Sequence, residues 1–317
     1  MRRHSTLLVA GTLTLTALAG CTDAGTSGSS SVTGTATGSG ASGSDGVSGP
    51  GTYSDATVQR GLGQLDGLIT KAMGATTIPG MATAVVYQGK VVYAKGFGVR
   101  QVGKSESVDP DTVFQLASVS KPLGATALGI AATQGKMSWD QPVQKGLPDF
   151  QLADPWVSSH VTVADMYSHR CGLPDHSGDV LEDLGYSQQE IFTRLSQAPL
   201  APFRNSYAYS NYGLMSGGES AARSMGMTWE ELVSTYLTKP LGMTSTSYTY
   251  ADLQSRTDRA ALHTKQAGVW TPNLGFDVDR QAPAGGASSS INDLAKWVTM
   301  LLKNGGAGSP IDAKNLL

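Results

Sequence analysis

The stretch Phe114-Gln115-Leu116-Ala117-Ser118-Val119-Ser120-Lys121-Pro122 contains the serine–lysine pair on which the fold assignment depends. Ser118 and Lys121 lie three residues apart, so on a helix their side chains share one face and the amine can reach the hydroxyl. A serine becomes a nucleophile when a neighbouring base takes its proton, and a lysine of lowered pKa can be that base. Because Pro122 is tolerated in a first helical turn, we expect Ser118 at the start of a helix, where its backbone N–H can bind an oxyanion.

A second polar motif, Tyr209-Ser210-Asn211, lies further along the chain. The Tyr209 phenol can accept or donate a proton if a lysine lowers its pKa, and the Asn211 amide can form hydrogen bonds to a substrate carbonyl. The sequence contains no serine with glycine both two residues before and two residues after it, and no His-Glu-x-x-His. The five histidines lack metal-ligand spacing, so neither a metal nor a cofactor is expected.

These motifs resemble those of the penicillin-binding protein and β-lactamase superfamily of serine hydrolases, nearest to its class C branch. Further phrases that match the family lie at residues 169–174, 240–243, 283–286 and 290–295, so the resemblance extends from about residue 54 to the end. The resemblance implies an acyl-enzyme mechanism in which Ser118 is the nucleophile. It also implies that Lys121 and Tyr209 share the general-base and general-acid work and that Asn211 contacts the substrate.

Two features depart from the family pattern. Cys171 stands where the family usually has serine or threonine, and we interpret it as a structural residue because no base adjoins it in the sequence. The family's third motif, a Lys/His-x-Gly on a late strand, has no counterpart here. Residues 263–265, His-Thr-Lys, lack the following glycine and come before Gly285-Gly286. We therefore expect the chain to be incomplete at its C-terminus, without the last strands of the sheet.

Apolar periodicity predicts the first elements of the folded part. Apolar residues between 54 and 73 have the spacing of one helix face. Two strand-like runs follow at 81–87 and 91–96, and the Gln88-Gly89 pair between them suits a tight hairpin turn.

Beyond Asp111 the pattern is mostly helical, and no further strand is evident. Capping boxes at Ser187–Glu190 and Thr228–Glu231 each predict a helix start, and another helix is expected over 291–303. With the family resemblance, the predicted fold class is α+β of the β-lactamase/transpeptidase type. It consists of an antiparallel sheet flanked by helices beside a helical subdomain, with the active site between them.

The first 21 residues have the features of a bacterial lipoprotein signal peptide. Arg2 and Arg3 precede an apolar run over 7–19, which is too short to span a bilayer of ~30 Å. The run leads to Leu18-Ala19-Gly20-Cys21, which resembles a lipobox whose cysteine is lipidated. Residues 22–52 are rich in glycine, serine and threonine and are expected to form a flexible linker. We therefore predict a hydrolase domain over 53–317, exported and lipid-anchored at the bacterial cell envelope through Cys21.

Composition narrows the choice of ligands. The 317-residue chain has a net charge of −2 and no run dense in lysine or arginine, which argues against nucleic acid as a partner. The function expected is an exported serine hydrolase acting on peptide, ester or β-lactam substrates. Two alternatives stay open: a β-lactamase or D-Ala-D-Ala carboxypeptidase proper, and, in another class, a tethered binding or sensor lipoprotein without catalysis. The oligomeric state is left open.

Overall fold

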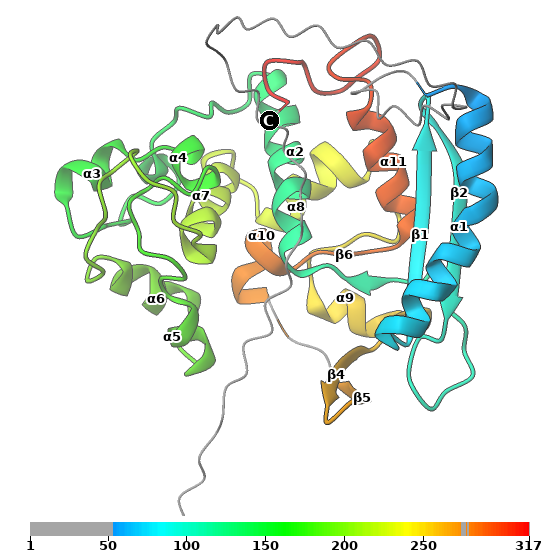
Figure 1. Ribbon diagram of the computed structural model, residues 1–317. Helices are drawn as coiled ribbons and strands as arrows, with labels where there is room; N and C mark the ends of the chain where they lie inside the picture. Colours follow the sequence, from blue (N-terminus) through cyan, green and yellow to red (C-terminus); the bar gives the residue numbers. More distant parts are fainter. Residues whose placement is uncertain (1–52, 274–276, 278, 317) are drawn as a thin grey trace, which may run out of the picture. The chain divides into compact units, whose positions relative to one another are not determined.

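The computed structural model describes residues 53–273, 277 and 279–316 (Figure 1). These residues belong to one compact unit of the chain. The expected signal peptide at 1–21, including Cys21, and the expected linker at 22–52 lie outside the described residues. Within the described part, no helix combines the length and the apolar character needed to cross a bilayer.

A long helix and a β-hairpin open the fold. Helix α1 (Asp55–Thr76) is followed by strands β1 (Gly80–Tyr87) and β2 (Lys90–Gly98), which pair antiparallel. Gln88 and Gly89, which connect the strands, both have positive φ, 49° and 71°. A two-residue turn with two positive φ angles has the twist that a hairpin needs. The predicted helix, both predicted strands and the predicted turn are confirmed.

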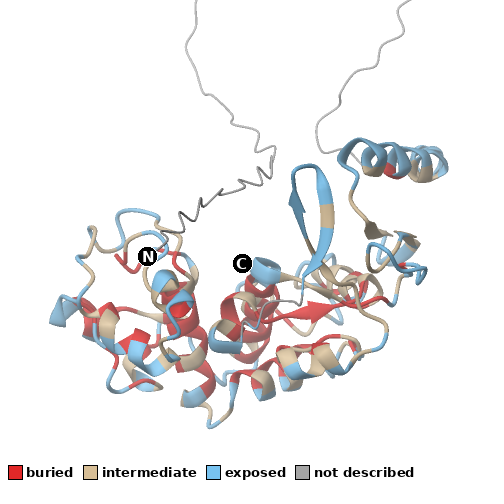
Figure 2. Cartoon of the chain, turned by 90° about the horizontal axis from the view of Figure 1, so that it is seen from below, coloured by how far each residue is buried: buried red, intermediate tan, exposed pale blue. Residues whose placement is uncertain are grey.

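The hairpin is covered by helices but is not deeply buried. Helix α11 (Ile291–Leu301), close to the predicted bounds, packs against both strands (Figure 1). Helix α1 is joined to β2 by polar contacts, because Asp66 accepts hydrogen bonds from Tyr93 and Lys95. No residue of β1 or β2 is fully buried, and in α1 only Ile69 is. Figure 2 accordingly shows α1 pale blue over most of its length.

The remaining helices form the well-packed part of the molecule. Helix α2 (Ser120–Thr133) lies at its centre, with ten of its 14 residues buried. Two apolar clusters form the core: one joins α2 to α8 (Trp229–Val233) and α11, and the other joins α4 (Val163–Tyr167) to α7 (Asn211–Ser224). The other helices are α3 (Pro155–His160), α5 (Asp179–Asp183), α6 (Gln188–Leu195), α9 (Tyr250–Ser255) and α10 (Ala282–Gly285). Both predicted capping boxes are confirmed, at the starts of α6 and α8.

The expectation that no strand follows the hairpin was wrong. Strand β3 (Phe114–Gln115) pairs with β6 (Ser288–Ser289), and β4 (Leu262–Gln266) pairs with β5 (Val269–Asn273). The first pair is too short to show a period. The second is mostly exposed, so its sequence lacks the apolar alternation that marks a half-buried strand. Among the described residues, none of these strands pairs with β1 or β2.

Candidate active site

Ser118 lies in a 3₁₀ turn (residues 117–119) between strand β3 and helix α2. Ala117, directly before it, has φ 47°, a left-handed conformation that costs a non-glycine residue about 1 kcal/mol or more. The surrounding packing holds this turn in place. The Leu116 N–H donates to the Ala287 carbonyl at 2.9 Å, and the Ala287 N–H donates to the Ser120 hydroxyl at 2.8 Å. The predicted position of Ser118 at the start of a helix is confirmed.

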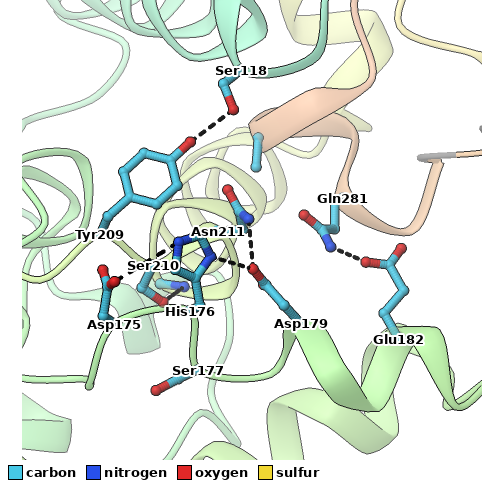
Figure 3. Close-up of polar contacts among 12 residues, drawn as sticks. Ser118, Asp175, His176, Ser177, Asp179, Glu182, Tyr209, Ser210, Asn211 and Gln281 are labelled. Carbon is cyan, nitrogen blue, oxygen red and sulfur yellow. Dashed lines mark hydrogen bonds and ion pairs between the residues drawn. The ribbon is translucent and has the colours of Figure 1, made fainter. Parts of the chain in front are cut away.

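The structure brings Ser118, Lys121 and Tyr209 together. Lys121 Nζ donates to Ser118 Oγ at 3.0 Å. Ser118 Oγ also lies 2.7 Å from the Tyr209 hydroxyl, where either oxygen can be the donor (Figure 3). Lys121 Nζ also donates to the Ala284 carbonyl of α10 at 2.8 Å and lies 4.7 Å from the centre of the Tyr209 ring. The serine hydroxyl therefore has an amine on one side and a phenol on the other.

Burial gives the two neighbours of Ser118 opposite protonation tendencies. It lowers the pKa of Lys121 to about 8, although the carboxylate of Asp179 raises it in part. Burial also raises the pKa of Tyr209, an effect that the hydrogen bond with Ser118 reduces. Near pH 8 the lysine can thus be a neutral amine while the tyrosine keeps its proton.

His169 fixes the chain on both sides of Tyr209. Its backbone carbonyl accepts a hydrogen bond from the Ala208 N–H at 2.9 Å, and its Nδ1 accepts one from the Ser210 N–H at 3.2 Å. The imidazole also packs against the phenol ring, with 4.8 Å between centroids. Burial, together with the positive charge of Lys121, lowers the pKa of His169 to about 4. The ring is therefore neutral at neutral pH, with its proton on Nε2.

Asn211, the expected substrate contact, is the first residue of α7 and lies near Tyr209 (Figure 3). Its Nδ2 donates to Asp179 Oδ2 at 2.9 Å, and His176 Nδ1 lies 2.8 Å from the same oxygen. Asp179 Oδ1 is buried and has no hydrogen-bond partner among the described residues. One amide N–H of Asn211 is thus bound within the protein, and its expected contact with a substrate stays a prediction.

A second carboxyl group lies on the same helix as Asp179. Glu182 accepts a hydrogen bond from the Gln281 amide, which directly precedes α10 (Figure 3). Burial raises the pKa of Glu182 to about 7. Helix α5 is thereby joined to α10, whose Ala284 carbonyl accepts the hydrogen bond from Lys121.

The cysteine and histidines noted in the sequence have other surroundings. Cys171 is a free, buried thiol, and burial raises its pKa, which fits the interpretation that it is structural. His263 Nε2 accepts from the Val102 N–H, and Lys265 Nζ donates to Thr77 near the end of α1, so residues 263–265 take part in contacts other than those of Ser118. In the described ranges, no three His, Cys, Asp or Glu side chains gather in a way that could hold a metal ion.

Sequence reasoning missed the contributions of His169 and Asp179 to the site. The sequence places His169 in a phrase that matches the family and among the histidines without metal-ligand spacing, and Asp179 belongs to no motif. The proximity of His176, Asn211 and Asp179 depends on how the loop over residues 170–178 folds back on the start of α7. A His–Asp spacing of three residues, as in His176 and Asp179, was the only local signal.

Comparisons with known proteins show which family the chain belongs to. The family model described as Beta-lactamase matches residues 65–316. Unguisins hydrolase ungD′ of Aspergillus campestris is 29% identical over 248 residues, which cover 71% of this chain and 44% of that protein. The β-lactamase of Escherichia coli strain K12 is 28% identical over 244 residues, 74% of this chain and 59% of that protein. Esterase EstB of Burkholderia gladioli is 28% identical over 204 residues, 60% of this chain and 52% of that protein.

A solved structure supports the same assignment at the level of the fold. The octameric penicillin-binding protein homologue from Pyrococcus abyssi matches with a TM-score of 0.69 and 24% identity, over 80% of this chain and 59% of that chain. The match of the family model to most of the sequence shows that the chain belongs to the β-lactamase family. The predicted family and its α+β fold class are thereby confirmed. The chain spans about half the length of the curated relatives it matches.

Proposed function

We propose that this protein is a serine hydrolase that forms an acyl-enzyme on Ser118 with peptide, ester or β-lactam substrates. One observation carries the proposal: Ser118 Oγ lies within hydrogen-bond distance of both the Lys121 amine and the Tyr209 hydroxyl. A serine between a lysine and a tyrosine has a base to take its proton and an acid to supply one to the leaving group.

The chemistry divides between the two neighbours of the serine. Neutral Lys121 takes the Ser118 proton as Oγ attacks the acyl carbon, and the carbonyl oxygen becomes an oxyanion beside the backbone N–H of Ser118. The proton then moves from Lys121 through the Tyr209 hydroxyl to the leaving nitrogen or oxygen, and the bond to the leaving group breaks. In the second step water attacks the acyl carbon, the proton transfers run in the opposite direction, and the carboxylic acid leaves as Ser118 regains its proton. Lys121 is assigned the first proton because its pKa is lowered whereas that of Tyr209 is raised.

The substrate class is supported in outline by the relatives. Their names include a β-lactamase and an esterase, so a β-lactamase or a D-Ala-D-Ala carboxypeptidase proper is the alternative within the family. A non-catalytic binding or sensor protein is the alternative of another class. The short contacts around Ser118 favour catalysis, because a binding protein has no need of a lysine buried against a serine.

Covalent labelling tests the nucleophile. A fluorescent penicillin and a fluorophosphonate are incubated with the purified chain, and the labelled peptide is identified by mass spectrometry. Label is expected at Ser118 and absent from Ser118→Ala, whereas Ser255→Ala, at an exposed serine of α9, keeps it. Full labelling of Ser118→Ala would remove the assignment, and absence of label from the wild type with both probes would favour the non-catalytic alternative.

We further propose that the protein is exported and held at the cell envelope by a lipid on Cys21. The support is the sequence Leu18-Ala19-Gly20-Cys21, which follows an apolar run, and the glycine- and serine-rich stretch after it. Cells fed radiolabelled palmitate are expected to label the wild-type protein and not Cys21→Ala. Unlabelled wild-type protein recovered from the medium would contradict the proposal.

A further inference from the structure

A pocket of about 470 Å³ lies beside the lysine of the site, between helices α2, α4 and α7. Such a volume is in the range of small-molecule sites. Its walls include Lys121, Ala125, Trp139, Tyr167, His169 and Leu214. Pro122 and Ser168, which also line it, are exposed, so the pocket is open to solvent on that side.

The pocket begins one side chain away from the proposed reacting atom. Lys121, which forms part of its wall, donates a hydrogen bond to Ser118 Oγ at 3.0 Å. Ser118, Lys121 and Ala125 follow one another at spacings of three and four residues and so lie on one side of the helix. A group attached to Ser118 can therefore extend along α2 past Lys121 toward Ala125.

The lining selects for an uncharged, apolar occupant. The Trp139 and Tyr167 rings meet edge to face, 5.6 Å between centroids, and Ala125, Ala164 and Leu214 supply aliphatic surface. Burial raises the pKa of Tyr167 strongly, so this phenol stays neutral.

His169 and Lys121, the two titratable side chains at the end of the pocket near Ser118, are compatible with an apolar occupant. Burial lowers the pKa of His169 to about 4, and burial lowers that of Lys121 to about 8. In the state with Lys121 neutral, the pocket wall therefore carries no formal charge. A charged group placed there would lose its hydration without gaining an opposite charge.

We propose that this pocket binds an apolar aliphatic or aromatic group on the acyl side of the substrate. The inference rests on the proposed acyl-enzyme function. The acyl group stays bonded to Ser118 through both steps, whereas the leaving group departs after the first. We therefore assign the pocket, which lies against Lys121, to the acyl group, because this part of the substrate stays bound after the first step.

A series of esters of one phenol, with linear acyl chains from acetyl to octanoyl, tests the pocket in the full chain. For the wild type, kcat/KM is expected to rise about fourfold per added methylene until the pocket is filled. Ala125→Leu narrows the pocket without touching Ser118 or Lys121. It is expected to lower kcat/KM for the octanoyl ester at least tenfold and to leave that for the acetyl ester within twofold.

Ala72→Leu is the matched control, because Ala72 is exposed on α1. It is expected to keep the wild-type chain-length profile. Identical profiles for Ala125→Leu and the wild type, with Ala125→Leu folded by circular dichroism, would overturn the inference.

A second measurement needs neither turnover nor the Ala125 variant. In Ser118→Ala protein, 6-bromohexanol is expected to quench Trp139 fluorescence with a saturable dose dependence, and Trp139→Phe is expected to remove that component. Quenching without any Ser118 labelling of the wild type would show that the pocket binds apolar molecules, but it would overturn the proposed function and with it the acyl-side assignment. Ser118 labelling without saturable quenching would overturn the pocket and leave the proposed function standing.

Discussion

Helices α1 and α2 show how differently two parts of this molecule are held. In α2, ten of 14 residues are buried, whereas in α1 one residue of 22 is. Helix α2 carries Lys121 and packs in the cluster that contains the side chains of Trp229 and Tyr248. Helix α1 is instead joined to β2 by exposed polar contacts. Close packing on all sides fixes side chains in single positions, so the proposed chemistry lies where the chain has least freedom.

The largest expected effect of this difference is on catalysis. Lys121→Met should lower kcat/KM by ~10²–10⁴-fold, because the proposed general base is lost. In the wild type, kcat/KM should rise with pH through an apparent pKa near 8 as Lys121 becomes neutral. Lys71→Met, at an exposed lysine of α1, is the control and should leave the rate and the pH profile unchanged. A rising limb that persists in Lys121→Met would assign the base to another group.

The same substitution should have the opposite effect on stability. The pKa of Lys121 is about 8 in the folded chain and about 10.4 when unfolded, so the unfolded chain binds more protons between these values. The free energy of unfolding of the wild type therefore rises with pH from about 8 to 10.4. At pH 7, Lys121→Met is expected to be more stable by up to about 3 kcal/mol, reduced by about 1 kcal/mol for the lost hydrogen bond to Ala284.

Urea unfolding at pH 7 and at pH 10 measures this effect. The advantage of Lys121→Met is expected to shrink at pH 10, and the Lys71→Met control should show no such change. A difference between Lys121→Met and the wild type that is equal at the two pH values would contradict the buried-lysine account.

Glycine-to-alanine changes compare the packing of the two helices directly. A Cβ at Gly124 of α2 would lie 2.7 Å from the Trp229 ring, whereas at Gly67 of α1 it would meet nothing within 4 Å. Gly124→Ala is expected to lower the free energy of unfolding by about 1–3 kcal/mol. Gly67→Ala is expected to raise it by about 1 kcal/mol, because alanine favours a helix over glycine. If chemical denaturation gave changes in the free energy of unfolding of the same sign for both variants, the proposed difference in packing between α1 and α2 would be contradicted.

Two aspartates extend the comparison to charged side chains, and the one on α1 has the smallest expected effect. Asp165 lies in the first turn of α4, where it accepts hydrogen bonds from Thr162 and from Arg204 at 2.8 Å, and its side chain is 11% exposed. Asp66 of α1 meets Lys95 with both side chains about half exposed. Asp165→Asn should destabilise by about 1–3 kcal/mol, whereas Asp66→Asn should leave the melting temperature within experimental error.

The pH dependence of the Asp165 effect has a definite sign. Burial raises the pKa of Asp165, but the hydrogen bonds from Arg204 and Thr162 outweigh burial, so the net shift is downward. The stability that the carboxylate supplies is thus present above its unfolded pKa and is lost as the pH falls through the folded value. The difference between wild type and Asp165→Asn should accordingly shrink in acid, and a constant difference would contradict this account.

Local features such as turns and helical contacts could be predicted from the sequence more accurately than the burial of side chains. The Ser118–Lys121 contact follows from helical spacing alone, and the hairpin turn follows from Gln88-Gly89. The approach of Tyr209 depends on long-range packing and was expected only through the family resemblance. The apolar face predicted for 54–73 is mostly half-buried, with Ile69 buried and Leu68 59% accessible, because periodicity shows which face is apolar and not how fully it is covered.

The hydrogen bond from Lys121 to the carbonyl of Ala284 bears on how the site tolerates sequence drift. The acceptor belongs to the main chain, so a substitution at position 284 that fits the available volume leaves it in place. Random mutation removes a side-chain partner in one step, but it removes this partner only by moving helix α10. The orientation of the lysine is therefore shielded from most single-residue changes at the position it contacts, and it depends instead on the path of the backbone.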